Sequence, residues 1–150
     1  MSHSYTKLLY HIVFGTKKRQ PWLVEEIQPD LYGILGGLVR EEGGTALAIN
    51  GMLEHVHILA RLRQDRAISD VIRAVKANSS NWLQKQLKNL PDRVWQTGYS
   101  AFTVSASQGG VVREYIVMQK EHHRNRIFEV ELPELLRRHD IEFDESELWE

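Results

Sequence analysis

The sequence of 150 residues contains no cysteine, which excludes disulfide scaffolds, cysteine-ligated zinc, iron–sulfur clusters and thiol catalysis. It has no run of about 18 apolar residues that could cross a membrane. Its first residues lack the basic and apolar segments of a secretory signal. A basic surplus, usual in nucleic-acid-binding proteins, is also missing, because the formal net charge is −1. We therefore expect a cytoplasmic protein, most simply a bacterial one, without a membrane partner.

The charge is distributed unevenly along the chain. Residues 129–150 hold nine acidic residues and only two basic ones, which gives this tail a charge of −7. Residues 1–128 carry 17 basic and 11 acidic residues, or +6. Such an asymmetry fits two interpretations: a solvated terminal helix, or a tail that docks on a neighbouring subunit or shields a basic face.

Hydrophobic periodicity predicts the order β-α-β-β-α-β followed by two further helices. The expected strands cover residues 5–15, 45–52, 55–62 and 94–105, and the expected helices cover 23–42, 68–87 and 111–124. Pro133 should open a short last helix, and Gln108-Gly109-Gly110 should break the chain before residue 111. This order predicts an α+β, ferredoxin-like sandwich in a single domain over 1–150. Its core covers about 5–105, and an acidic tail covers 129–150.

One candidate site is the pair His55 and His57 on the third expected strand. Alternate side chains of a strand share a face, so both imidazoles point the same way while Val56 and Ile58 point into the core. Two imidazoles one strand step apart can bind one divalent metal. The alternative is two polar residues on the solvated side of a half-buried strand.

A second candidate is Tyr115 with Gln119, four residues apart and therefore neighbours on one helical face, with His122 on the same face. The alternative is a packed tyrosine ring beside a solvated glutamine. Together with the histidines, these residues suggest a tyrosine nucleophile beside a metal that polarises a phosphodiester oxygen. Gln119 could be a third ligand, and no general base is identified.

These motifs resemble a known family. His55-Val56-His57 is similar to the HUH motif of metal-dependent single-strand DNA nucleases. Tyr115-x-x-x-Gln119 followed by His122-His123 is similar to the catalytic helix of the single-tyrosine transposases of small bacterial insertion sequences. The resemblance extends to segments 10–20, 69–82, 98–105 and 135–139, in the order that the family has.

The resemblance implies an HUH-type transposase whose catalytic helix covers about 111–124. Tyr115 would attack single-stranded DNA, form a 5′-phosphotyrosine link and free a 3′-hydroxyl that later rejoins DNA. His55, His57 and Gln119 would hold Mg²⁺ or Mn²⁺, and two imidazoles suit Mn²⁺ somewhat better.

The partners that the resemblance implies are single-stranded DNA hairpins at element ends and a second copy of the chain. In such a homodimer each site combines the histidines of one subunit with the tyrosine helix of the other. Gly109 and Gly110 would then act as a hinge for that helix. Arg19, Arg73 and Lys76 are the basic residues that we expect, as a group, to contact DNA phosphates.

Three other functions compete with this interpretation. Histidine-triad nucleotide hydrolases need a third histidine where this chain has Leu59. A domesticated or inactive relative would bind hairpin DNA without transposing it, although the catalytic residues predicted here are all intact. A housekeeping relative that acts on repetitive extragenic palindromes would share the chemistry and differ in its substrate.

Overall fold

The computed structural model describes residues 3–124 and 126–150. Its centre is an antiparallel four-stranded sheet with the order β2-β3-β1-β4. The strands are β1 (Leu8–Gly15), β2 (Thr45–Gly51), β3 (His55–Leu62) and β4 (Ser100–Val104). This strand order confirms the predicted ferredoxin-like arrangement.

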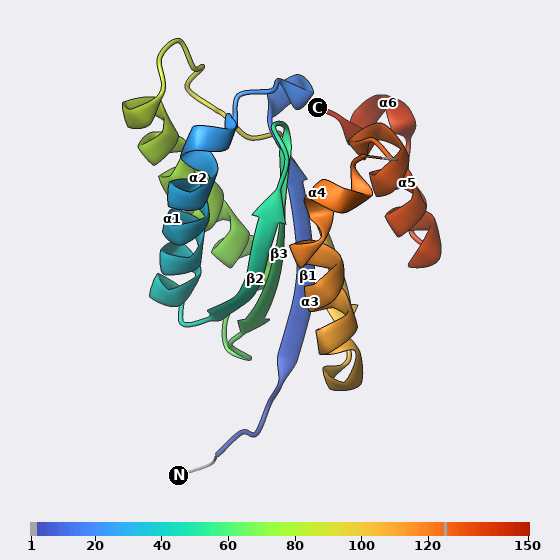
Figure 1. Ribbon diagram of the computed structural model, residues 1–150. Coiled ribbons are helices and arrows are strands. Elements are labelled where there is room, and N and C mark those ends of the chain that lie inside the picture. The colour runs from blue at the N-terminus through green and yellow to red at the C-terminus, as the bar shows by residue number, and fades with distance from the viewer. Residues whose placement is uncertain (1–2, 125) are drawn as a thin grey trace.

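Two long helices, α1 (Gln28–Glu41) and α2 (Ile68–Gln86), cover one face of the sheet (Figure 1). Alternate residues of the central strands point toward these helices. Phe14, Val56 and Ile58 are almost completely buried in this main core. The alternation follows from the two-residue period of a strand, and it leaves the opposite set of side chains on the other face.

The other face is covered by α3 (Gly109–Val117), α4 (Gln119–His122), α5 (Phe128–Arg138) and α6 (Glu145–Leu148) (Figure 1). Val13 and Phe102 of the sheet form a second apolar core with Phe128 and Leu132 of α5. The interpretation of the tail as a solvated helix is therefore wrong for α5. Its apolar side is buried against the sheet of its own chain.

Short 3₁₀ turns precede several of these elements, at Lys17–Arg19, Glu25–Ile27 and Ala106–Gln108. In the part of the chain that the structure describes, no helix is both long and apolar enough to cross a bilayer.

The fourth strand is shorter than the predicted 94–105, since β4 begins only at Ser100. The ammonium of Lys76 explains the difference. Its Nζ donates hydrogen bonds to the carbonyl oxygens of Gln96, Thr97 and Gly98, at 2.6, 3.2 and 2.7 Å. Carbonyls that accept from one ammonium turn toward the same point, which a regular strand cannot allow because its carbonyls alternate in direction.

The predicted continuous helix over 111–124 is wrong, because it is divided at Met118 into α3 and α4. Met118 has φ −91° and ψ 17°, outside the helical range. The side chain of Asn50 donates to the carbonyl of Val117 at 3.0 Å. This carbonyl, on the last residue of α3, therefore accepts a hydrogen bond from outside the helix. The expected break at 108–110 is also misplaced, since Gly109 and Gly110 form the first turn of α3.

Pro133 does not open the last long helix, as the sequence suggested, but lies inside α5, which begins at Phe128. Proline has no N–H to donate, so the carbonyl of Glu129 lacks its helical partner. Burial of Pro133 and its neighbour Leu132 favours the helix in spite of this loss.

Candidate functional site

The site begins with two histidines of β3. His55 and His57 point to the α3–α5 face of the sheet, and both side chains are completely buried. The interpretation of these residues as polar groups on a solvated face is therefore wrong. A buried imidazole needs hydrogen-bond partners for both ring nitrogens.

Each histidine has its Nδ1 atom fixed by a neighbour. Nδ1 of His55 lies 2.6 Å from the carboxylate of Glu54, and Nδ1 of His57 lies 2.8 Å from Nε2 of His11 on β1. This pairing leaves both Nε2 atoms directed toward a common point. A partner on the second nitrogen is the usual way in which proteins orient a metal-binding imidazole.

The common point is occupied by the carboxylate of Glu131 from α5. Its Oε1 lies 3.4 Å from Nε2 of His55 and 3.2 Å from Nε2 of His57. His123 contacts the same oxygen at 3.1 Å, and Nε2 of Gln119 donates to Oε2 at 2.9 Å. Glu131 is only 1% exposed, so these contacts replace its hydration.

Gln119 and Tyr115 join this cluster from α4 and α3. The side-chain oxygen of Gln119 lies 3.3 Å from Nε2 of His55, and Gln119 is completely buried. The hydroxyl of Tyr115 donates to Oε2 of Glu131. The break at Met118 therefore leaves both predicted side chains directed at the same cluster, although they belong to different helices.

The ring of Tyr115 is half-buried and stacks on His122 with ring centres 4.8 Å apart. It also meets the ring of His57 edge-on at 5.8 Å. Burial, followed by the nearby charge of Glu131, raises the pKa of the Tyr115 hydroxyl. In this arrangement Tyr115 is held as a neutral hydrogen-bond donor.

Burial lowers the pKa of His55 and His57, whereas the nearby carboxylates raise it, and the balance differs between the two. Burial lowers the pKa of His57 to about 4, against the smaller opposing influence of Glu131. Burial would also lower the pKa of His55, but hydrogen bonds to Glu131 and Glu54 outweigh it, so this pKa is raised. Burial would raise the pKa of Glu131, but its contacts with the three histidines lower it instead.

This donor set suits a divalent metal. One donor atom each from His55, His57 and Glu131 lies within 4.8 Å of the other two. Imidazole nitrogens combined with a carboxylate favour transition metals such as Mn²⁺ over the harder Mg²⁺. The Gln119 oxygen adds a further possible ligand. The three predicted ligands, His55, His57 and Gln119, therefore lie together.

The predicted DNA-binding residues do not form one group. The guanidinium of Arg19 lies 4.5 Å from the ring centre of Trp149 and 3.5 Å from Glu129, so it contacts the C-terminal segment. Arg73 and Lys76 lie on α2 and line a cavity whose lining does not include Arg19. Lys76 uses its ammonium on the three carbonyls described above.

Sequence reasoning missed three members of the cluster, His11, Glu54 and Glu131, and it named His123 in the motif without giving it a role. Two local signals could have found some of them. His11 is a polar residue within an apolar strand, and Glu54 directly precedes the histidine motif. Glu131 had no such signal, because it is one of nine acidic residues in the tail.

The chain is similar in sequence to known proteins. Residues 4–119 match the family described as "Transposase IS200 like". The ISDra2 transposase TnpA of Deinococcus radiodurans is 27% identical over 120 residues, which cover 77% of this chain and 86% of that protein.

Solved structures show the same architecture. The crystal structure of a protein from Deinococcus radiodurans, described as a transposase, superposes with a TM-score of 0.64 at 27% identity. The match covers 79% of this chain and 96% of the other. A REP-associated tyrosine transposase bound to a REP hairpin shares the fold, with a TM-score of 0.61 at 17% identity. That match covers 82% of this chain and 73% of that one.

The family match thus accompanies a ferredoxin-like sheet that carries buried histidines, a carboxylate and a tyrosine at one cluster. The chain belongs to the IS200-like transposase family, whose match covers most of its length.

Proposed function

We propose that the protein cleaves and rejoins single-stranded DNA at hairpin-marked ends through a 5′-phosphotyrosine intermediate. The observation that carries this proposal is the hydroxyl of Tyr115 at the same buried cluster as His55, His57 and Gln119. A nucleophile beside a metal-binding set is the arrangement that phosphodiester transfer needs. The hairpin bound to the REP-associated relative supports this choice of substrate.

The reaction has two transfers. The Tyr115 oxygen forms a bond to the phosphorus, the bond from phosphorus to the 3′-oxygen breaks, and a 3′-hydroxyl is released. A 3′-hydroxyl then attacks the same phosphorus, which rejoins DNA and returns Tyr115. The bond energy is kept in the link, so no nucleotide hydrolysis is required.

We propose that His55, His57, Gln119 and Glu131 hold a divalent metal, Mn²⁺ or Mg²⁺. Such an ion polarises a phosphodiester oxygen and stabilises the charge that builds up during transfer. The chain itself orients the two imidazoles, because Glu54 and His11 each hold the Nδ1 atom of one of them. For attack, the Tyr115 hydroxyl must lose its proton, which burial and then the charge of Glu131 oppose by raising its pKa.

A homodimer with sites shared between subunits remains part of this proposal. Here Tyr115 lies beside the histidines of its own chain. A shared site therefore requires α3 to move to a second copy, and Gly109 and Gly110 begin that helix. Rotation at these glycines would meet little side-chain resistance.

The test is a covalent adduct with DNA. The protein is incubated with labelled single strands from its own genomic flanks and Mn²⁺ or Mg²⁺, and is then denatured. We expect the native chain to retain label and Tyr115→Phe to retain none, because phenylalanine has no hydroxyl. An adduct formed equally well by Tyr115→Phe would refute the proposal. Hairpin binding by the native chain without any adduct would support the alternative, a relative that binds DNA without cutting it.

A further inference from the structure

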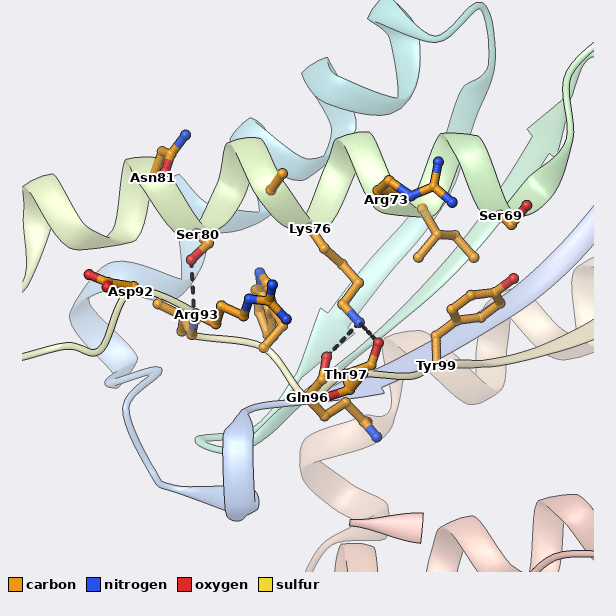
Figure 2. A pocket seen from close by; sticks show the side chains of 14 residues that line it. Ser69, Arg73, Lys76, Ser80, Asn81, Asp92, Arg93, Gln96, Thr97 and Tyr99 are labelled. Carbon is orange, nitrogen blue, oxygen red and sulfur yellow. Dashed lines mark hydrogen bonds between the residues drawn. The ribbon is translucent and has the colours of Figure 1, made fainter. Parts of the chain in front are cut away.

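A cavity of about 550 Å³ lies between α2 and the segment that leads into β4, apart from the histidine cluster (Figure 2). Its lining includes Arg73 and Lys76 of α2 and Arg93, Trp95 and Tyr99 of the segment. The volume falls within the range of about 300–1,000 Å³ that is usual for small-molecule sites. Nothing in the proposed chemistry of the histidine cluster uses this cavity.

The wall of the cavity is held in place by several hydrogen bonds. Lys76 donates to the carbonyls of Gln96, Thr97 and Gly98, and Figure 2 shows two of these bonds. The indole of Trp95 donates to Ser79 at 2.9 Å, and the N–H of Val94 donates to Ser80 at 3.2 Å. A wall fixed in this way is pre-formed, which reduces the entropy that a ligand must overcome.

Besides the exposed polar side chains of Asp92 and Asn81, the lining offers aromatic and cationic groups. Tyr99 has 38% of its surface exposed, although it is a large ring. Arg93 is exposed and forms no ion pair with any residue that the structure describes. Among the described residues, Arg73 pairs only with the exposed Asp70, at 3.0 Å, and such a surface pair is weak and easily exchanged. An aromatic face with two guanidinium groups matches a base and its phosphates.

The cavity is also connected to the histidine cluster. Gln96 of its wall exchanges two hydrogen bonds with Gly15 of β1, at 2.9 and 2.6 Å. In the sheet, Gly15 pairs with His55. The wall of the cavity is therefore attached to the end of the sheet that carries the metal-binding histidines. A DNA strand that contacted both the cavity and the histidine cluster would therefore contact two directly linked parts of the protein.

We propose that this cavity binds one unpaired nucleotide of the DNA strand on which the histidine cluster acts. The base stacks on Tyr99, and its flanking phosphates contact Arg73 and Arg93. This inference rests on the proposed function. It replaces Lys76 by Arg93 among the predicted DNA contacts, because the three protons of the Lys76 ammonium are used within the chain.

Photochemical crosslinking tests the contact directly. The full chain carrying Tyr115→Phe, which cannot cut, is irradiated with stem-loop DNA that has a single-stranded extension containing 5-iodo-deoxyuridine. We expect one position of the extension to crosslink to Tyr99, as read by mass spectrometry of the peptides. Crosslinks confined to residues outside the cavity, at every substituted position, would overturn the proposal.

Affinity gives an independent readout with matched variants. Stacking of one base contributes about 1–3 kcal/mol, so Tyr99→Leu should weaken binding of the same DNA on the order of tenfold in fluorescence anisotropy. Tyr99→Phe keeps the ring and should bind normally. Tyr5→Leu removes a ring that is 92% exposed elsewhere and is the control for the substitution. Arg93→Gln should weaken binding, whereas Arg40→Gln on α1 should not.

The remaining outcomes distinguish failure of the cavity assignment from failure of the proposed function. If Tyr99→Leu binds as Tyr5→Leu does while the native chain still forms the covalent adduct, the cavity assignment is wrong and the proposed function stands. If the native chain neither binds stem-loop DNA nor forms an adduct, the proposed function is wrong. The cavity assignment, which rests on it, is then wrong as well. Free thymidine monophosphate that bound as tightly as the strand would also overturn the proposal, because it would indicate a nucleotide site independent of DNA.

Discussion

At the residue scale, the carboxylate of Glu131 is the group that five other side chains of the cluster contact. His55, His57 and His123 lie around one oxygen, and Gln119 and Tyr115 donate to the other. A buried carboxylate is stable only where charges or hydrogen-bond donors surround it. The same oxygen, which lies within hydrogen-bond distance of these three imidazoles, is a suitable ligand for a divalent ion.

Substitution of Glu131 by glutamine should therefore weaken metal binding. We expect the affinity for Mn²⁺ to fall by a factor on the order of ten or more. Substitution of a residue that only supports a metal ligand already lowers metal affinity about tenfold to a hundredfold. Isothermal titration calorimetry on the full chain measures this change. Glu129→Gln, two positions away on the surface, is the matched control. Equal affinities for the native chain and Glu131→Gln would exclude Glu131 as a ligand.

Metal binding should also depend on pH through His55. Its pKa is raised above the usual 6.5, whereas the pKa of His57 is lowered to about 4. Ligand imidazoles must be neutral. As pH falls through the raised pKa of His55, a proton competes with the metal and the affinity falls, while His57 stays neutral. Near pH 6, calorimetry in buffers of different ionisation enthalpy should show release of about one proton per ion. Binding without proton release would contradict these pKa directions.

At the scale of single elements, the sequence predicted the site best where side-chain spacing alone decides direction. The two-residue period placed His55 and His57 on one face. Tyr115 and Gln119 also reach the same cluster, although the continuous helix on which their four-residue spacing relied is divided at Met118. Glu131 could not be predicted in this way. The inward side of α5 depends on where that helix begins, and Pro133 suggested a start five residues later than Phe128.

The limits of β4 were unpredictable for a similar reason. The apolar pattern of 94–105 is compatible with one strand, but a tertiary contact from Lys76 turns the carbonyls of 96–98 inward. Burial lowers the pKa of Lys76 to about 8, so its ammonium remains charged near neutral pH. The spacing of residues on α2 does not indicate whether such a lysine meets solvent, DNA or the chain itself.

Replacement of Lys76 by methionine should destabilise the fold rather than weaken only the contact with DNA. Hydrogen bonds from a charged group contribute about 1.5–3 kcal/mol, and we expect a loss of about 2 kcal/mol in the free energy of unfolding. Urea unfolding measures it, with Lys85→Met on the exposed side of the same helix as the control. Unchanged stability together with weaker DNA binding would show that Lys76 contacts phosphates, as the sequence first suggested.

At the scale of the whole molecule, the near-zero net charge hides a basic body and an acidic tail. The tail is not free, because α5 lies on the sheet, Glu131 is buried in the cluster and Glu129 lies near Arg19. Acidic groups thus lie close to the histidine cluster, which DNA must reach under the proposed function. We infer that a few placed contacts, and not a broad basic surface, hold the DNA.

This arrangement predicts a weak dependence of DNA affinity on salt. Each phosphate contact on single-stranded DNA contributes about 0.7 to the slope of log K against log salt. Four contacts or fewer would give a slope of about −3 or shallower. Anisotropy titrations of stem-loop DNA over a range of salt concentrations measure it. A slope of about −7 or steeper would indicate a broad basic interface.

The central claim is that Tyr115 is the nucleophile, and the most direct test is to locate the DNA on the protein. After reaction with a single-stranded hairpin substrate and digestion with nuclease and protease, mass spectrometry should find a nucleotide phosphate on the peptide that contains Tyr115, attached to that tyrosine. The same phosphate on Tyr99, on Tyr10 or on a histidine would contradict the account.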